Sequence, residues 1–264
     1  MKRILQATSL ALFLALAAGT QPAAASDSLS RLPAGLQVKD DGPRTYRFTC
    51  DYVNLDTKGN TTGMKQHVVG EYTRGLPDGK ARWNGVAVNG QKREFMEGFT
   101  YRLADTGNSL KAEFFPGFPP MAFQERNLVW DTVMLEGFAE NYFDKLSLNV
   151  PYHVAPATFP LAGAGQFENK DLTLTWIGVS KRNGQKCVLI DYAAFLNKVN
   201  IKFTSMELVA RSHYWGQIWV SLATKQIEYA TLYEDVLGEM KIEAQPKPMI
   251  VNVFRIGAFE RVVP

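Results

Sequence analysis

The sequence predicts a mainly β protein, an antiparallel curved sheet (a half-barrel, barrel or sandwich) with one helical or irregular insertion near the middle. Three observations support this fold class. Apolar and polar residues alternate from Arg44 onward, two Asn-Gly pairs each lie between extended segments, and a proline-bearing stretch over 151–160 separates two strand-rich halves. In RTYRFTCDY, residues 44–52, one face is apolar and the other polar, as in a half-buried strand.

The two Asn-Gly pairs predict hairpin turns. Asn89-Gly90 lies between ARWNGVAV and QKREFMEGFTYRL, and Asn183-Gly184 lies between LTLTWIGVSKR and QKCVLIDYAAF. Because Asn and Gly both tolerate positive φ, each pair suits a type I′ turn. The same alternation predicts further strands around 64–73, 206–221, 227–233, 239–244 and 249–261.

The insertion contains the best helix candidate, DTVMLEGFAENYFDK over 131–145, with Asp131 as its N-cap. Glu136, Glu140 and Asp144 recur at helical spacing, so they would line one face of this helix. A row of carboxylates is one way to bind a hard cation. We expect a solvated helix face instead, because the opposite face carries apolar side chains.

The N-terminus predicts export. Lys2 and Arg3 precede a short apolar stretch and a small-residue run ending at Ala25, which together make residues 1–25 a secretory signal peptide. Its removal takes two of the 29 basic side chains and none of the 26 acidic ones, so the formal net charge falls from +3 to +1. We expect a periplasmic protein of a Gram-negative bacterium, with secretion as the second choice. No later apolar segment is long enough for a stable membrane span.

The mature chain divides into a polar, flexible leader over 26–43 and a β-rich domain over 44–264, with a division into two lobes near 150–165 left open. Its two cysteines, Cys50 and Cys187, both fall in strand-like segments. An oxidising compartment would allow a disulfide between them. The alternative is two separate buried thiols, and the sequence leaves both open.

Motifs for catalysis and cofactors are missing. The sequence has no H-E-x-x-H, G-x-S-x-G, P-loop or paired C-x-x-C, and Gly163-Ala164-Gly165 is too short for a nucleotide fingerprint. The three histidines, His67, His153 and His213, show no metal-ligand spacing. Basic residues do not cluster with aromatic ones, so nucleic acid is a poor partner. We therefore expect no cofactor, no metal and no assignable catalytic residue.

Two aromatic segments remain as candidates for binding. In AEFFPGFPPMAF, residues 112–123, the prolines exclude a central strand, so Phe115 and Phe118 lie on a loop that plugs the core or covers a ligand. In SHYWGQIWVS, residues 212–221, a strand would place His213, Trp215 and Trp219 on one face. Such a face suits the concave side of a sheet that holds an amphipathic or apolar ligand, although tryptophans packed under a helix are the alternative.

The segments LTLTWIGVSKRNGQKCVLIDY and SHYWGQIWVSLATKQIEYATLYEDVLGEMKI, within about 170–245, resemble exported bacterial proteins with a strongly curved sheet or half-barrel. The lipoprotein carriers of the Lol system are of this kind. The resemblance implies a concave apolar face that accepts acyl chains, and only Trp215 and Trp219 fall on the matching strand. The segment 112–165 departs from a minimal half-barrel and would fill the concave face if it lies across it.

The leading hypothesis is a non-enzymatic periplasmic module that binds a hydrophobic or amphipathic, lipid-like ligand on Trp215 and Trp219, with 114–123 as a lid. The second is a secreted hydrolase or lyase, with His153 or His213 as general base and Asp191 or Glu207 as its orienting carboxylate. The third is an interaction protein of the cell envelope, which would expose a flat apolar patch to a partner protein.

Overall fold

A computed structural model describes residues 29, 31–40, 42–63, 65–203 and 205–263. The predicted signal peptide, residues 1–25, lies outside these described residues, as does the start of the leader. Over 31–40 the chain has no helix or strand. It contacts the turn that follows β11, because the backbone N–H of Lys39 donates to the carbonyl of Thr224 (2.9 Å).

The described residues form one 13-stranded antiparallel sheet, which confirms the predicted fold class. The first strands are β1 (Arg44–Asn54), β2 (Gln66–Leu76), β3 (Lys80–Val88), β4 (Gln91–Lys92), β5 (Phe99–Arg102), β6 (Tyr152–Val154) and β7 (Ala157–Pro160). The later strands are β8 (Gly165–Asn169), β9 (Asp171–Arg182), β10 (Gln185–Phe203), β11 (Met206–Ser221), β12 (Ile227–Ile242) and β13 (Met249–Arg261).

The strand order is β4-β3-β2-β1-β13-β12-β11-β10-β8-β7, with β5 beside β3 and β9 between β10 and β6. This path does not close on itself within the described chain. Strands from both sides of residues 150–165 therefore belong to the same sheet. Both predicted hairpin turns are confirmed, since Asn89, Gly90, Asn183 and Gly184 all have positive φ between paired strands.

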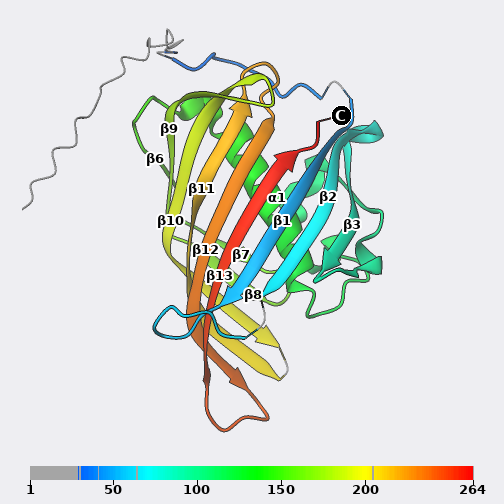
Figure 1. Ribbon diagram of the computed structural model, residues 1–264, viewed down its shortest axis with the longest axis vertical. Helices are drawn as coiled ribbons and strands as arrows, with labels where there is room; N and C mark the ends of the chain where they lie inside the picture. Colours follow the sequence, from blue (N-terminus) through cyan, green and yellow to red (C-terminus); the bar gives the residue numbers. More distant parts are fainter. Residues whose placement is uncertain (1–28, 30, 41, 64, 204, 264) are drawn as a thin grey trace, which may run out of the picture.

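The one α-helix of the described residues, α1 (Phe123–Asn141), packs on the sheet, and Figure 1 shows the strands curving around it. Its side chains contact residues of four neighbouring or nearby strands, β2, β1, β13 and β10, from Tyr72 of β2 to Tyr192 of β10. The described residues also form five short 3-10 helices: η1 (Pro77–Gly79), η2 (Glu94–Met96), η3 (Leu103–Asn108), η4 (Ala112–Phe114) and η5 (Phe143–Lys145). The helical part of the middle insertion thus lies inside the curved sheet, while β6 and β7 of the same segment belong to the sheet itself.

The helix prediction was right in type and wrong at its start. The helix begins eight residues before Asp131, after Ala122, whose side chain makes no capping hydrogen bond. No capping residue marks this start in the sequence, so tertiary contacts must fix it. Asp131 is buried within the helix and forms an ion pair with Arg255 of β13.

The prediction of a solvated row of carboxylates is also wrong for one of the three residues. Glu136 is buried, and it accepts hydrogen bonds from Arg74 (2.7 Å) and Tyr72 (3.2 Å) of β2. Glu140 accepts a second bond from Arg74 (2.8 Å). The sequence could not reveal this, because Arg74 lies more than sixty residues away in the chain.

Candidate binding groove on the outer face of the sheet

Strand β11 has the two faces that its alternation predicts. Tyr214, Ile218 and Val220 are buried on the face toward α1. Trp215 and Trp219 lie on the opposite face, which we call the outer face. The prediction that these tryptophans line the concave side is wrong, because α1 covers the concave side and the tryptophans point away from it.

The outer face carries a groove of about 520 Å³, called the outer groove below. Its lining comes from four neighbouring strands: Thr173 and Thr175 of β9, Asp191, Tyr192, Ala193 and Phe195 of β10, Trp215, Gly216 and Gln217 of β11, and Thr231 and Tyr233 of β12. Its volume lies within the range of small-molecule sites in proteins.

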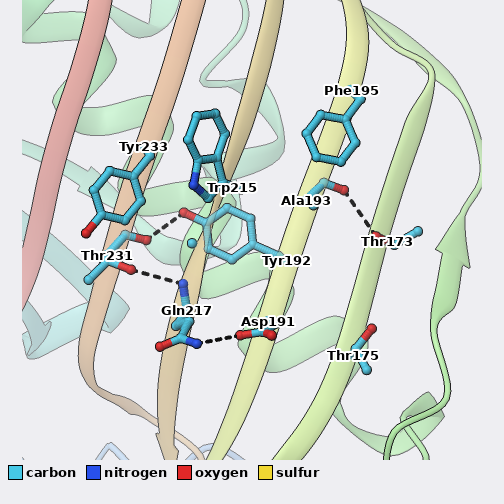
Figure 2. Close-up of a pocket in the computed structure, with 11 residues that line it drawn as sticks. Thr173, Thr175, Asp191, Tyr192, Ala193, Phe195, Trp215, Gln217, Thr231 and Tyr233 are labelled. Atoms are coloured by element: carbon cyan, nitrogen blue, oxygen red, sulfur yellow. Dashed lines mark hydrogen bonds between the residues drawn. The ribbon is translucent and has the colours of Figure 1, made fainter. Parts of the chain in front are cut away.

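Aromatic and polar groups form two bands in this groove. Figure 2 shows Phe195, Trp215 and Tyr233 along one side, with Asp191 and Gln217 along the other. The rings of Trp215 and Tyr233 stack with 5.9 Å between their centroids and 23° between their planes. Ala193 pairs with Trp215 in the strand register, so a small side chain lies beside the largest one.

The polar band is held by hydrogen bonds. The Nε2 of Gln217 donates to Asp191 (2.8 Å), and the backbone N–H of Gln217 donates to the hydroxyl of Thr231 (3.1 Å). No salt bridge to Asp191 occurs within the described chain. Its carboxylate therefore faces the groove as an acceptor without a counterion, a group that hydroxyl and N–H donors bind well.

A β-bulge shapes one wall of the groove. The register between β10 and β11 shifts between Ala194 and Asn197, and this shift turns Phe195 and Leu196 outward. Phe195 is 45% exposed and Leu196 is 61% exposed. Leu196 also has a φ of 58°, a conformation that costs a non-glycine residue about 1–3 kcal/mol.

Tyr192 lies under the groove and fixes its floor. Its hydroxyl donates to the carbonyl of Thr231 (2.7 Å) across Gly216. Burial raises the pKa of Tyr192 well above its usual value, so the hydroxyl keeps its proton and remains a donor. This bond ties β10 to β12 across the strand that carries Trp215.

The other predicted ligand-binding residues do not join Trp215 in the outer groove. Trp219 lies on the same face but pairs with Tyr229, at 5.2 Å between ring centroids, and does not line the groove. His213 contacts the ring of Phe195 at 5.8 Å from just outside the lining.

Phe115 and Phe118 are buried on the other side of the sheet, where they pack with each other, with Phe99 and near Trp130. The 112–123 segment therefore joins the core. It does not cover Trp215, so the predicted lid over the tryptophans is wrong.

The histidines do not form the expected acid–base pairs. His153 lies 3.9 Å from Asp171, and both side chains are well exposed on the surface. Within the described chain, no hydrogen bond joins His213 to a carboxylate. His67 does bond to Asp51 (2.7 Å), on an exposed part of neighbouring strands. Neither Asp191 nor Glu207 is brought to a histidine.

Cys50 and Cys187 are free, buried thiols, so the disulfide alternative is wrong and the two-thiol alternative holds. They lie on β1 and β10, which three strands separate in the sheet. Burial raises the pKa of each thiol to about 11. Both are therefore protonated at neutral pH and weak nucleophiles.

Part of the outer groove was missed by sequence reasoning. Thr173, Thr175 and Thr231 sit on strands whose neighbours depend on the long-range register, which one sequence does not specify. Phe195 lies within the bulge, and no local signal marks it.

Among the described residues, no helix is both long and apolar enough to cross a membrane. No protein-family model and no curated protein matches this chain.

Proposed function

We propose that the protein is a non-enzymatic binding module of the bacterial periplasm, and that it holds an amphipathic ligand in the outer groove. The observation that carries this proposal is the pairing of an aromatic band with a hydrogen-bonding band in one groove. The periplasmic location rests on the predicted signal peptide.

The arrangement of the groove favours a flat ligand with hydroxyl groups. Phe195, Trp215 and Tyr233 offer ring faces for an apolar surface. Asp191 and Gln217 offer acceptors and donors to groups at the edge of the ligand. A sugar ring, with a C–H face and hydroxyl edges, matches both bands. A free acyl chain has no group that could hydrogen-bond to Asp191 or Gln217.

The bulge at Phe195 supports the same proposal. Leu196 has a positive φ and is more than half exposed. This conformation costs free energy, which the rest of the fold must offset. Its effect is to place Phe195 at the wall of the outer groove. Strain of this kind is concentrated at sites of function, and this one adds a wall to the groove.

Octyl β-glucoside, which joins a sugar ring to an apolar chain, tests the proposal by titration calorimetry below its micelle concentration. We expect saturable binding that weakens at least tenfold in Trp215→Ala, equivalent to about 1.4 kcal/mol. Asp191→Asn should weaken it three- to tenfold. Trp219→Ala is the matched control, because it removes the same side chain from the same face outside the groove, and it should keep the affinity within twofold.

Two results would count against the proposal. One is a wild-type protein that produces no saturable heat with octyl β-glucoside or with methyl β-glucoside, its chain-free counterpart. The other is equal weakening in Trp215→Ala and Trp219→Ala, which would indicate a nonspecific apolar face.

A further inference from the structure

Arg126 is a buried cation in the first turn of α1, on the side of the sheet away from the outer groove. Only 7% of the residue is exposed. Its guanidinium donates to the carbonyl oxygens of Pro120 (2.8 Å) and Pro119 (3.1 Å). Its Nε–H is buried and has no acceptor. Three of its five N–H donors are therefore left for another partner.

The charge of Arg126 has no counterion within the described chain, where no carboxylate oxygen lies within 4.0 Å of it. The adjacent Glu125 is paired with Arg93 instead (2.7 Å). The other two strongly buried arginines differ, because Arg74 and Arg255 each contact at least two carboxylates. Burial lowers the pKa of Arg126, yet an arginine remains charged at neutral pH. A buried charge without a partner is costly.

Arg126 opens onto a pocket of about 300 Å³, called the Arg126 pocket below. The other residues of its lining have apolar side chains or none: Ala112, Phe115, Phe118, Pro120, Ala162, Gly163, Ala164 and Phe203. Ala112, Pro120 and Gly163 are exposed at the rim, so the pocket is open to solvent. The rings of Phe115 and Phe118 lie 5.7 and 5.9 Å from the guanidinium carbon.

These features define the ligand by its chemistry. A single cation at one end of an apolar pocket requires one negative charge on an apolar body. The amino end of the 19-residue α1 adds positive potential at the same place. A carboxylate can accept from the Nε–H and from a neighbouring N–H of the guanidinium together. Three phenyl rings are available to contact the apolar body.

We propose that the Arg126 pocket binds a small apolar monocarboxylate, with the carboxylate on Arg126 and its apolar body against Phe115, Phe118 and Phe203. This site is independent of the outer groove, so either proposal can fail without the other.

Phenylacetate is the probe, and calorimetry on the wild-type protein gives the first test. Its neutral counterpart 2-phenylethanol should bind at least tenfold more weakly, since it has the same ring without the charge. Inorganic phosphate should also bind at least tenfold more weakly, since it has charge without an apolar body. Equal affinity for phenylacetate and either comparison compound would overturn the proposal, and so would undetectable binding of phenylacetate.

Arg126→Met gives the second test, because methionine keeps an apolar stem and removes the charge. Phenylacetate affinity should fall at least tenfold, while the melting temperature without ligand should stay the same or rise. Arg211→Gln, which removes an exposed arginine of β11, and Trp215→Ala in the outer groove should both bind within twofold of wild type. Retained binding in Arg126→Met would overturn the proposal. If that variant does not fold, the comparison of three ligands on the wild type decides.

Discussion

Gly216 shows how one residue position supports the outer groove. An added Cβ at this position would lie 2.1 Å from the carbonyl oxygen of Thr231 and 2.7 Å from the hydroxyl of Tyr192. The strand can therefore pass under the bond between Tyr192 and Thr231 only if residue 216 has no side chain. Glycine is needed at this position because there is no space for a side chain. The backbone conformation of Gly216 is an ordinary one for a strand and does not itself require glycine.

We predict that Gly216→Ala lowers the free energy of unfolding by about 1–3 kcal/mol, because the new methyl group must displace backbone or the Tyr192 hydroxyl. Urea unfolding followed by tryptophan fluorescence measures the change. Gly107→Ala is the matched control, since an added Cβ there meets nothing within 4 Å, and it should change stability by less than about 0.5 kcal/mol. Similar losses in both variants would contradict this account of Gly216.

At the scale of elements, α1 is joined to the sheet by two groups of buried charges. In the first, Arg255 of β13 contacts Asp131 of α1 and Glu234 of β12, and Ser212 of β11 donates to Glu234 (2.6 Å). In the second, Arg74 of β2 contacts Glu136 and Glu140 of α1. A polar connection of this kind fixes how the helix lies across the strands, because apolar contacts alone are less directional.

We predict that Arg255→Met lowers the free energy of unfolding by about 3–5 kcal/mol, because Asp131 and Glu234 are then buried without their cation. Arg47→Met is the control. It breaks the exposed pair with Glu71 (3.4 Å) and should cost less than about 1 kcal/mol. Calorimetric or urea unfolding compares the two. An effect below about 1 kcal/mol for Arg255→Met would mean that this buried group does not anchor the helix.

Elements that local sequence determines could be predicted well. Strands over 206–221 and 249–261 have the predicted bounds, because apolar and polar residues alternate along most of each. The helix contacts could not be predicted, because Asp131 and Arg255 are 124 residues apart in the chain. Alternation also separated the two faces of β11 correctly. It could not identify the covered face, since that depends on where α1 packs.

At the scale of the whole molecule, α1 lies inside the curve of the sheet. It therefore occupies the concave surface on which an open half-barrel would bind a ligand. The side expected to hold a lipid-like ligand is filled by α1 and by the aromatic residues before it. The described residues also form the outer groove, with both polar and aromatic lining, and the smaller Arg126 pocket beside the helix. Each has a charged or hydrogen-bonding group beside aromatic rings, which is why each proposed ligand is amphipathic.

The buried charges that hold α1 also make the stability of the whole molecule depend on pH. Burial raises the pKa of Glu136 to about 7, with Glu140 adding to the effect and Arg74 opposing it. Burial likewise raises the pKa of Asp131 to about 6, against the opposing effect of Arg255. Each carboxyl therefore holds its proton more tightly in the folded state than in the unfolded chain, where the usual values are near 4.

We predict that the free energy of unfolding falls by about 2–4 kcal/mol between pH 5 and pH 8. Over this range the folded protein binds more protons than the unfolded chain, so raising the pH favours unfolding. Urea unfolding at half-unit steps of pH measures the slope. Glu136→Gln should flatten the profile most between pH 5 and 7, since a neutral amide there no longer titrates. A stability that rises steadily from pH 5 to pH 8 would show that Arg74 and Arg255 outweigh burial, and that both carboxylates are charged throughout.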